Sequence, residues 1–207
     1  MCDGIAADYA EKQKYLKFTH NFDDDILSAS RNMAKRYRCN TSHGQKIENY
    51  ALQIFDAMKK FHGLGTRERL LLQIASILHD CGKFISLRDS SACAYNIIMA
   101  TEIIGLSHAE REIVAEVVRC NLDAFRYGEG SIRAGKLTAM LRLANAMDRS
   151  HHGRLDDGKL QVKGNKLIIS TSYAGNLALE TIAVEDKADF FEEMFGIRPE
   201  IRQKRRV

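Results

Sequence analysis

The sequence lacks several features that mark specialised classes of protein. It has no tryptophan and a single proline, Pro199, so helices can run far without forced breaks. Its five cysteines form no C-x-x-C pair, which argues against a zinc finger and against a disulfide framework. No stretch approaches the roughly 20 apolar residues of a membrane span, and acidic residues stand where a signal peptide has a basic start. We therefore expect a reduced, cytoplasmic protein with no membrane partner.

The composition is that of an ordinary folded protein. Of the 207 residues, 45% are hydrophobic and 28% are charged, which excludes disordered and collagen-like chains. The 31 Lys and Arg against 27 Asp and Glu give a formal net charge of +4. That excess is too small for a dedicated nucleic-acid-binding protein, and the basic run at 202–206 is typical of a solvated tail. Nucleic acid is not an expected partner, whereas a small phosphate-bearing molecule is compatible with this charge.

Helical periodicity dominates the first 150 residues. Residues 70–78 are apolar on nearly all sides, which predicts a central, buried helix that begins at a Thr66 cap. Ser107 and Glu110 have capping-box spacing at the start of another helix. The remaining helices are predicted at 42–61 and at about 24–39, 90–104, 107–120 and 136–149. Glycines that indicate a loop before the last helix are Gly128, Gly130 and Gly135.

After residue 150 the pattern changes. Residues 159–163 and 166–170 alternate polar and apolar side chains around Gly164-Asn165, which predicts a hairpin. A third strand is predicted at 177–184, a helix at 187–195 and a last strand at 198–204. The fold class is therefore mainly α, with a helical domain over residues 1–155 and a small α+β domain over 156–207.

Three helices each direct one metal-capable side chain toward the core, and Asp80 adjoins one of these side chains. His43 precedes Ile47 by four residues, His79 and Asp80 end the buried helix, and Asp148 follows Ala144 at helical spacing. A buried imidazole or carboxylate is costly unless it is paired or binds a metal. Each of them alone is more simply explained as a hydrogen-bonded core residue. Together they form a mixed nitrogen and oxygen set that suits a divalent ion such as Mg, Mn, Fe, Ni or Zn.

The order His43, His79-Asp80, Asp148 resembles the HD superfamily of metal-dependent phosphohydrolases. The segments LLLQIASILHDCGKFIS and LTAMLRLANAMDRSH are similar to the C-terminal half of the exopolyphosphatase / guanosine pentaphosphate phosphohydrolase (Ppx/GppA) family. The resemblance covers about residues 25–155 and continues weakly beyond. It implies an HD-type helical domain in which these four residues hold the metal. Family members also carry a two-lobed actin-like phosphatase, of which this sequence shows no trace.

The resemblance also bears on the number of metal ions. Two-metal HD enzymes add histidines near the positions of residues 90–93 and 119–121, where this chain has none. We therefore expect one divalent ion per chain.

Residues next to the four ligands indicate phosphate chemistry. Lys83 can neutralise a phosphate oxygen as a point charge, and Arg149 is a second candidate for binding substrate. His151 and its neighbour His152 are close enough in sequence to reach the rim of the site. These residues favour metal-assisted hydrolysis of a nucleotide or other phosphate ester, with Asp80 and Lys83 as catalytic residues.

The alternative is a non-catalytic module. Such a module would bind a polyanion such as polyphosphate, or a separately encoded actin-like phosphatase as its partner. A homodimer is compatible with both interpretations.

Overall fold

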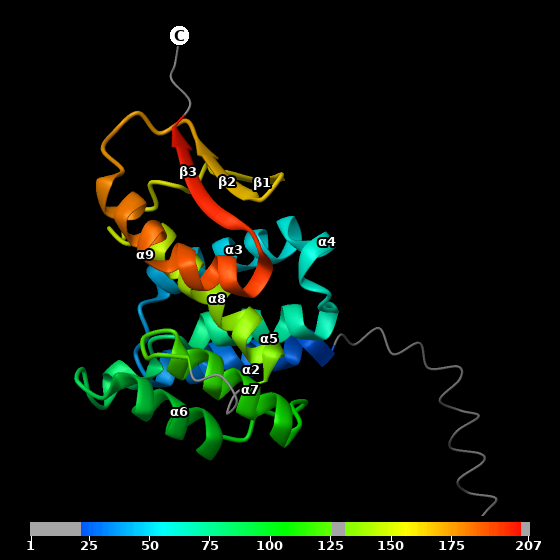
Figure 1. Ribbon diagram of the computed structural model, residues 1–207. Coiled ribbons are helices and arrows are strands. Elements are labelled where there is room, and N and C mark those ends of the chain that lie inside the picture. The colour runs from blue at the N-terminus through cyan, green and yellow to red at the C-terminus, as the bar shows by residue number, and fades with distance from the viewer. Residues whose placement is uncertain (1–21, 126–130, 204–207) are drawn as a thin grey trace, which may run out of the picture.

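The computed structural model describes residues 22–125 and 131–203. The chain forms helices first and a small sheet last (Figure 1), in the order α2 (Phe22–Arg36), α3 (Thr41–Ala57), α4 (Lys59–His62), α5 (Thr66–Leu78), a short 3-10 helix η1 (Cys81–Phe84), α6 (Ser90–Ala100), α7 (His108–Cys120), α8 (Ile132–Met147), β1 (Lys159–Lys163), β2 (Lys166–Thr171), α9 (Ala178–Phe195) and β3 (Arg198–Gln203). The predicted fold class, mainly α with a small C-terminal α+β part, is confirmed.

Helix α5 is the centre of the helical part. It packs against α2, α3, α7 and α8, and every residue from Leu70 to Leu78 except Gln73 is buried. The predicted central helix is thus confirmed, and its C-terminal end delivers His79 to the interior. Its cap differs from the prediction, because Gly65 and not Thr66 is the N-cap. The N–H of Gly65 donates to the carboxylate of Glu68 at 2.8 Å, so the helix begins one residue earlier in the chain than a Thr66 cap would allow.

Two other helix boundaries differ from the sequence pattern. The helix predicted over 42–61 is divided at Met58 into α3 and α4. Gly135 lies inside α8 instead of in a loop, because a Cβ there would stand 3.0 Å from Sδ of Met194 and 3.1 Å from the ring of Phe125. This glycine therefore serves close packing between elements. Gly128 and Gly130 lie outside the described residues.

The sheet begins with the predicted hairpin. Strands β1 and β2 pair antiparallel with Lys163 opposite Lys166, and Gly164 in the turn has a φ of +58°. The last strand, β3, adds to β2 in parallel, with Leu167 opposite Pro199, so the strand order is β1-β2-β3.

The predicted third strand at 177–184 is wrong. These residues lead into α9 and form its first turns. Its buried positions are spaced three or four residues apart, which is the helical period, and they are Leu177, Glu180, Val184, Ala188 and Phe191. The apolar residues of 177–184 fit either period over so short a window, and packing on α8 selects the helix.

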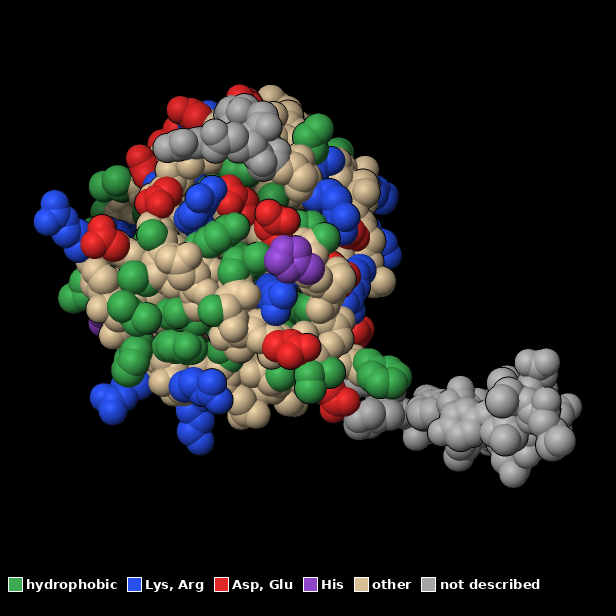
Figure 2. Space-filling model, turned by 90° about the horizontal axis from the view of Figure 1, so that it is seen from below, with side chains coloured by type: hydrophobic (Ala, Val, Ile, Leu, Met, Phe, Trp, Pro, Cys, Tyr) green, Lys and Arg blue, Asp and Glu red, His purple; other side chains and the backbone are tan. Residues whose placement is uncertain are grey.

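Helix α9 packs on both α8 and β3 and joins the two parts of the chain (Figure 1). One core cluster includes Leu141 of α8, Ile169 of β2 and Phe191 of α9. The face opposite the sheet carries exposed hydrophobic side chains in one area, with charged side chains around them (Figure 2). Across the two described segments, no helix combines the length and the apolar character that crossing a bilayer requires.

Candidate metal centre

The four predicted ligands all lie at helix ends. His43 stands in the first turn of α3, where its N–H donates to the side-chain oxygen of the N-cap Asn40 at 3.2 Å. His79 and Asp80 form the step from α5 into η1, and Asp148 directly follows α8. His43, His79 and Asp148 are buried, with 4%, 4% and 0% of their surface exposed. Helix packing thus directs polar side chains from three parts of the sequence into the interior.

His43 is the common member of two candidate metal-binding groups. Ligand atoms of His43, His79 and Asp80 lie within 4.8 Å of one another, and so do those of His43, Asp148 and His151. The imidazole of His43 is 5.3 Å from that of His79 and 3.9 Å from that of His151, measured between ring centroids. Within the described residues, no group of four meets the same limit. The structure therefore gathers the four predicted ligands around His43 and adds His151.

The two nitrogens of the His79 imidazole differ in their hydrogen bonding. Its Nδ1 lies 2.7 Å from the carbonyl oxygen of Ser76, and since a carbonyl only accepts, Nδ1 carries the hydrogen. Its Nε2 is buried without a hydrogen-bond partner, and the nearest carboxylate oxygen, from Asp80, is 3.5 Å away. Burial lowers the pKa of His79 and so favours the neutral ring. Metal-bound histidines in proteins use this arrangement, with one nitrogen held by a backbone carbonyl and the other free to coordinate.

Two carboxylates bring negative charge to the cluster. Asp148 accepts from Nδ1 of His43 at 2.7 Å and from the N–H of Gly153 at 2.8 Å. Burial acts to raise the pKa of Asp148, but these hydrogen bonds and nearby positive charge outweigh burial and leave the pKa below its ordinary value. Burial likewise acts to raise the pKa of Asp80, but this pKa is also below its ordinary value, because the ammonium of Lys83, 2.7 Å away, stabilises the ionised carboxylate. Both carboxylates are therefore ionised at neutral pH, as metal coordination requires.

His151 belongs to the cluster through the backbone turn after α8. Its N–H donates to the carbonyl oxygen of Asp148 at 2.9 Å, and its φ of +59° is unusual for a residue other than glycine. The pKa of His151 is lowered by partial burial and by the neighbouring His43. The sequence signal was its position three residues after Asp148, which predicted a place at the rim but no ligand role. His152 is exposed, and its Nδ1 lies within hydrogen-bond distance of the carbonyl oxygen of Ser150.

Comparison with known proteins identifies the family. Residues 27–182 match the family model described as Ppx/GppA phosphatase, domain III, which is well over half of the chain. The chain belongs to the Ppx/GppA domain III family. The guanosine-5'-triphosphate,3'-diphosphate pyrophosphatase of Photobacterium profundum is 24% identical to it over 150 residues. This stretch covers 70% of the chain and 30% of that relative, so the chain spans about 30% of the length of the curated relative that it matches.

The two predicted phosphate-binding cations of this Ppx/GppA domain III chain lie in different places. Nζ of Lys83 is 2.7 Å from the carboxylate of Asp80, and the lysine side chain is 45% exposed, so it stands at the open side of the cluster. Arg149 is exposed and lines another cavity of about 460 Å³, between the end of α7, α8 and α9. None of the five residues of the metal-binding groups lines that cavity. The structure therefore brings Lys83 to the predicted ligands and directs Arg149 elsewhere.

Proposed function

We propose that this domain III chain is a metal-dependent phosphohydrolase that acts on a small phosphate ester at the cluster around His43. The observation that carries the proposal is the buried, unpartnered Nε2 of His79, which stands beside the ionised carboxylate of Asp80. A buried nitrogen lone pair without a donor is costly in a purely structural role, and coordination of a cation would satisfy it.

Five side chains have the chemistry to hold one divalent ion, namely His43, His79, Asp80, Asp148 and His151. Neutral imidazoles and ionised carboxylates suit the borderline and hard first-row cations and Mg²⁺. When bound, such an ion would polarise a phosphoryl oxygen and lower the pKa of a coordinated water. The family match supports phosphate chemistry, because its model is described as a phosphatase domain.

The remaining roles follow from charge and position. Lys83 carries a half-exposed ammonium beside Asp80 and would neutralise a phosphate oxygen of the substrate. The lone pairs of Asp80 that Lys83 leaves free could accept a proton from the attacking water. Asp148 holds His43 by a hydrogen bond at Nδ1, which fixes the orientation of that ring.

One observation favours the second candidate, a non-catalytic module that binds polyphosphate or a separate phosphatase chain. Both oxygens of Asp148 already accept hydrogen bonds, from His43 and from the backbone of Gly153. That half of the cluster is internally satisfied and could serve as a structural pair between α3 and the segment after α8. A module of this kind would retain the cluster without turnover.

Metal analysis combined with a phosphatase assay tests the proposal. The purified chain is analysed for bound metal and assayed with added Mn²⁺ or Mg²⁺ on nucleotides, p-nitrophenyl phosphate and polyphosphate. We expect slow, metal-dependent turnover of small esters and no processive degradation of long polyphosphate. Asp80→Ala should lose both metal and turnover, because it removes a ligand next to His79. Asp24→Ala, an exposed carboxylate in the first turn of α2, is the matched control.

The outcomes separate the two candidates. Lys83→Ala should keep the metal and raise the KM for substrate, since this lysine faces phosphate and not the ion. If the wild-type chain retains metal but hydrolyses none of the substrates, the cluster is structural and the module interpretation replaces the enzyme.

A further inference from the structure

Two cavities lie on the side of the α2–α3 connection, and one of them adjoins the metal centre. The smaller one, of about 200 Å³, includes both Asp80 and Lys83 of the centre. The larger one, of about 390 Å³, lies between α2, α3 and the C-terminal half of α5. Cys39 and Asn40 line both cavities, so the two spaces share this short connection as a wall. The larger cavity includes none of the residues of the metal-binding groups.

Arg38 supplies an uncommitted positive charge to the smaller cavity. Its φ of +50° is unusual for a residue other than glycine, and the side chain extends over Phe84 with Cζ 5.8 Å from the ring centroid. Across residues 22–125 and 131–203, its guanidinium makes no hydrogen bond or ion pair. A strained backbone conformation of this kind persists only where the surrounding structure holds the residue in place.

Lys83 and Arg38 approach the same space from two elements. Lys83 belongs to η1, as does Phe84, on whose ring Arg38 lies. Tyr37 contacts the same ring edge to face, with centroids 5.9 Å apart, and so fixes it against the α2–α3 connection. The lining of the smaller cavity therefore includes two cationic side chains and one carboxylate, that of Asp80. These three groups together carry a net charge of +1, which attracts a phosphate group.

The larger cavity has the character of a site for an organic group. The carboxylate of Glu48 on its wall is already engaged, by Arg31 at 2.7 Å and by Gln73 at 2.7 Å. The carboxamides of Asn32 and Gln45 make no hydrogen bond within the described residues and line the space. Free amides next to an apolar wall are typical of pockets that bind polar organic molecules, and the volume is in the range of small-ligand sites.

We propose that the two cavities form one substrate cleft, in which Arg38 and Lys83 bind the phosphate of a monoester and the larger cavity binds its organic group. The proposal rests on the proposed function, because the phosphate is placed at the same metal centre. It assigns a substrate class, phosphate monoesters whose organic group has about the size and polarity of a nucleoside. It also assigns Arg38 as a substrate-binding residue.

Gly44 offers a way to close the larger cavity alone. It lies in α3 on the wall of that cavity, and a Cβ at this position would meet no atom within 4 Å. Gly44→Leu therefore fills the cavity without a backbone clash and raises helix propensity. Arg38→Gly removes the guanidinium and suits the left-handed backbone. Arg36→Ala, an exposed arginine that lines neither cavity, is the matched control for charge.

The experiment is calorimetric titration of the full chain with inorganic phosphate and with adenosine 5'-monophosphate. We expect the wild type to bind the nucleotide at least about tenfold more tightly than phosphate, since the organic group adds contacts. Gly44→Leu should abolish this difference and leave the phosphate affinity unchanged. Arg38→Gly should weaken both ligands about tenfold, as expected for loss of one charge-assisted contact, and Arg36→Ala should weaken neither.

Each failure has a separate meaning. Equal affinity of the wild type for the two ligands, no binding of either, or an unchanged nucleotide affinity in Gly44→Leu would overturn the cleft. Metal content and turnover of p-nitrophenyl phosphate are measured on the same samples. If turnover is metal-dependent while the variants bind as the wild type does, the cleft is wrong and the proposed function stands. If the nucleotide binds as expected while metal and turnover are absent, the cleft stands and the hydrolase does not.

Discussion

At the scale of single residues, the centre depends on side chains whose partners are fixed by the backbone. The Ser76 carbonyl determines the tautomer of His79, and the Gly153 N–H holds one oxygen of Asp148. These contacts orient the ligands before any ion binds, which reduces the reorganisation that binding requires. A backbone position close to the ligands should therefore tolerate little change.

Gly82, two residues after Asp80, is such a position. A Cβ there would overlap the backbone carbonyl of Ser90 and lie 2.7 Å from the amide nitrogen of Ala94. Gly82→Ala should force η1 away from α6 and lower the free energy of unfolding by about 2–4 kcal/mol. It should also weaken metal retention, because Asp80 moves with η1.

Thermal denaturation and metal analysis check this prediction. Gly44→Ala is the control, since its Cβ meets nothing within 4 Å and it should stabilise α3 by about 0.5–1 kcal/mol. If Gly82→Ala unfolds at the wild-type temperature, the close contact between η1 and α6 does not constrain the chain.

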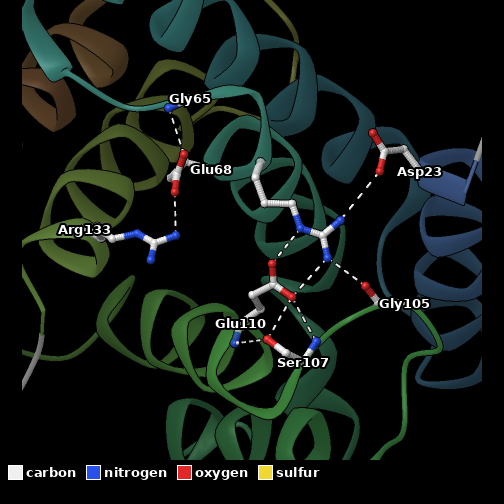
Figure 3. Close-up of polar contacts among 8 residues, drawn as sticks. Asp23, Gly65, Glu68, Gly105, Ser107, Glu110 and Arg133 are labelled. Atoms are coloured by element: carbon white, nitrogen blue, oxygen red, sulfur yellow. Dashed lines mark hydrogen bonds and ion pairs between the residues drawn. The ribbon is translucent and has the colours of Figure 1, made fainter.

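At the scale of elements, polar networks at helix ends hold the helices in place. Arg67 at the start of α5 donates to the carboxylate of Glu110 in α7, at 2.6 and 3.0 Å, and to the carbonyl of Gly105 at 2.7 Å (Figure 3). Glu110 also accepts from the N–H and the hydroxyl of Ser107, both at 2.9 Å, which completes the predicted capping box. One carboxylate thus caps α7 and ties it to α5.

Glu110→Gln tests this junction through its pH dependence. The hydrogen bonds from Arg67, with those from Ser107, lower the pKa of Glu110 to about 2 from an ordinary value of 4.5. A carboxyl whose folded pKa is depressed stabilises the fold above its unfolded pKa and loses this contribution as the pH falls through the folded pKa. We therefore expect the variant to be less stable by about 1–2 kcal/mol at pH 7, since the carboxylate is one-fifth exposed and partly screened.

The difference should shrink as the pH falls from about 4.5 toward 2, where the wild-type carboxyl becomes protonated. Urea denaturation at pH 7, 4 and 2.5 measures it. Glu112→Gln, an exposed glutamate of the same helix, should show no comparable loss. A difference that is constant over this pH range would mean that charge is not what Glu110 contributes.

At the scale of the whole molecule, α9 joins the helical part and the sheet into one folding unit. Its buried Phe191 belongs to the same core cluster as Leu141 of α8, and Arg142 of α8 stacks on Phe190 with Cζ 4.7 Å from the ring centroid. A continuous core of this kind predicts cooperative unfolding. The boundary between residues 155 and 156 remains a prediction, and the shared core argues that it separates two parts of one unit.

Truncation after residue 155 should expose the face of α8 that α9 covers. We expect the fragment to lose its cooperative thermal transition, because the apolar residues that pack against Val184 and Phe191 become exposed to water. The full chain should melt in a single transition. Circular dichroism and calorimetry of both proteins measure these properties. A fragment that melts cooperatively near the full-chain temperature would show instead that the helical part is an independent domain.

Much of the fold follows from local pattern in the sequence. The uniform apolarity of 70–78 specifies a buried helix, Ser107 with Glu110 specifies a cap, and Gly164-Asn165 specifies a hairpin turn. Each depends on residues close together in the chain, so no knowledge of the remainder is needed. The same holds for His43, His79 and Asp148, because helical spacing already directs them inward.

Only the tertiary structure decided the features that depend on contacts between distant segments. Packing on α8 made a helix of 177–184, and the approach of Met194 explains a glycine inside α8 at residue 135. The turn after Asp148 brings His151 onto His43. Arg38 and Lys83 line one cavity although they come from separate parts of the chain. Spacing along one helix or strand shows on which face a side chain lies. The residues that it contacts depend on how the elements pack, and a short window of sequence holds no information on that packing.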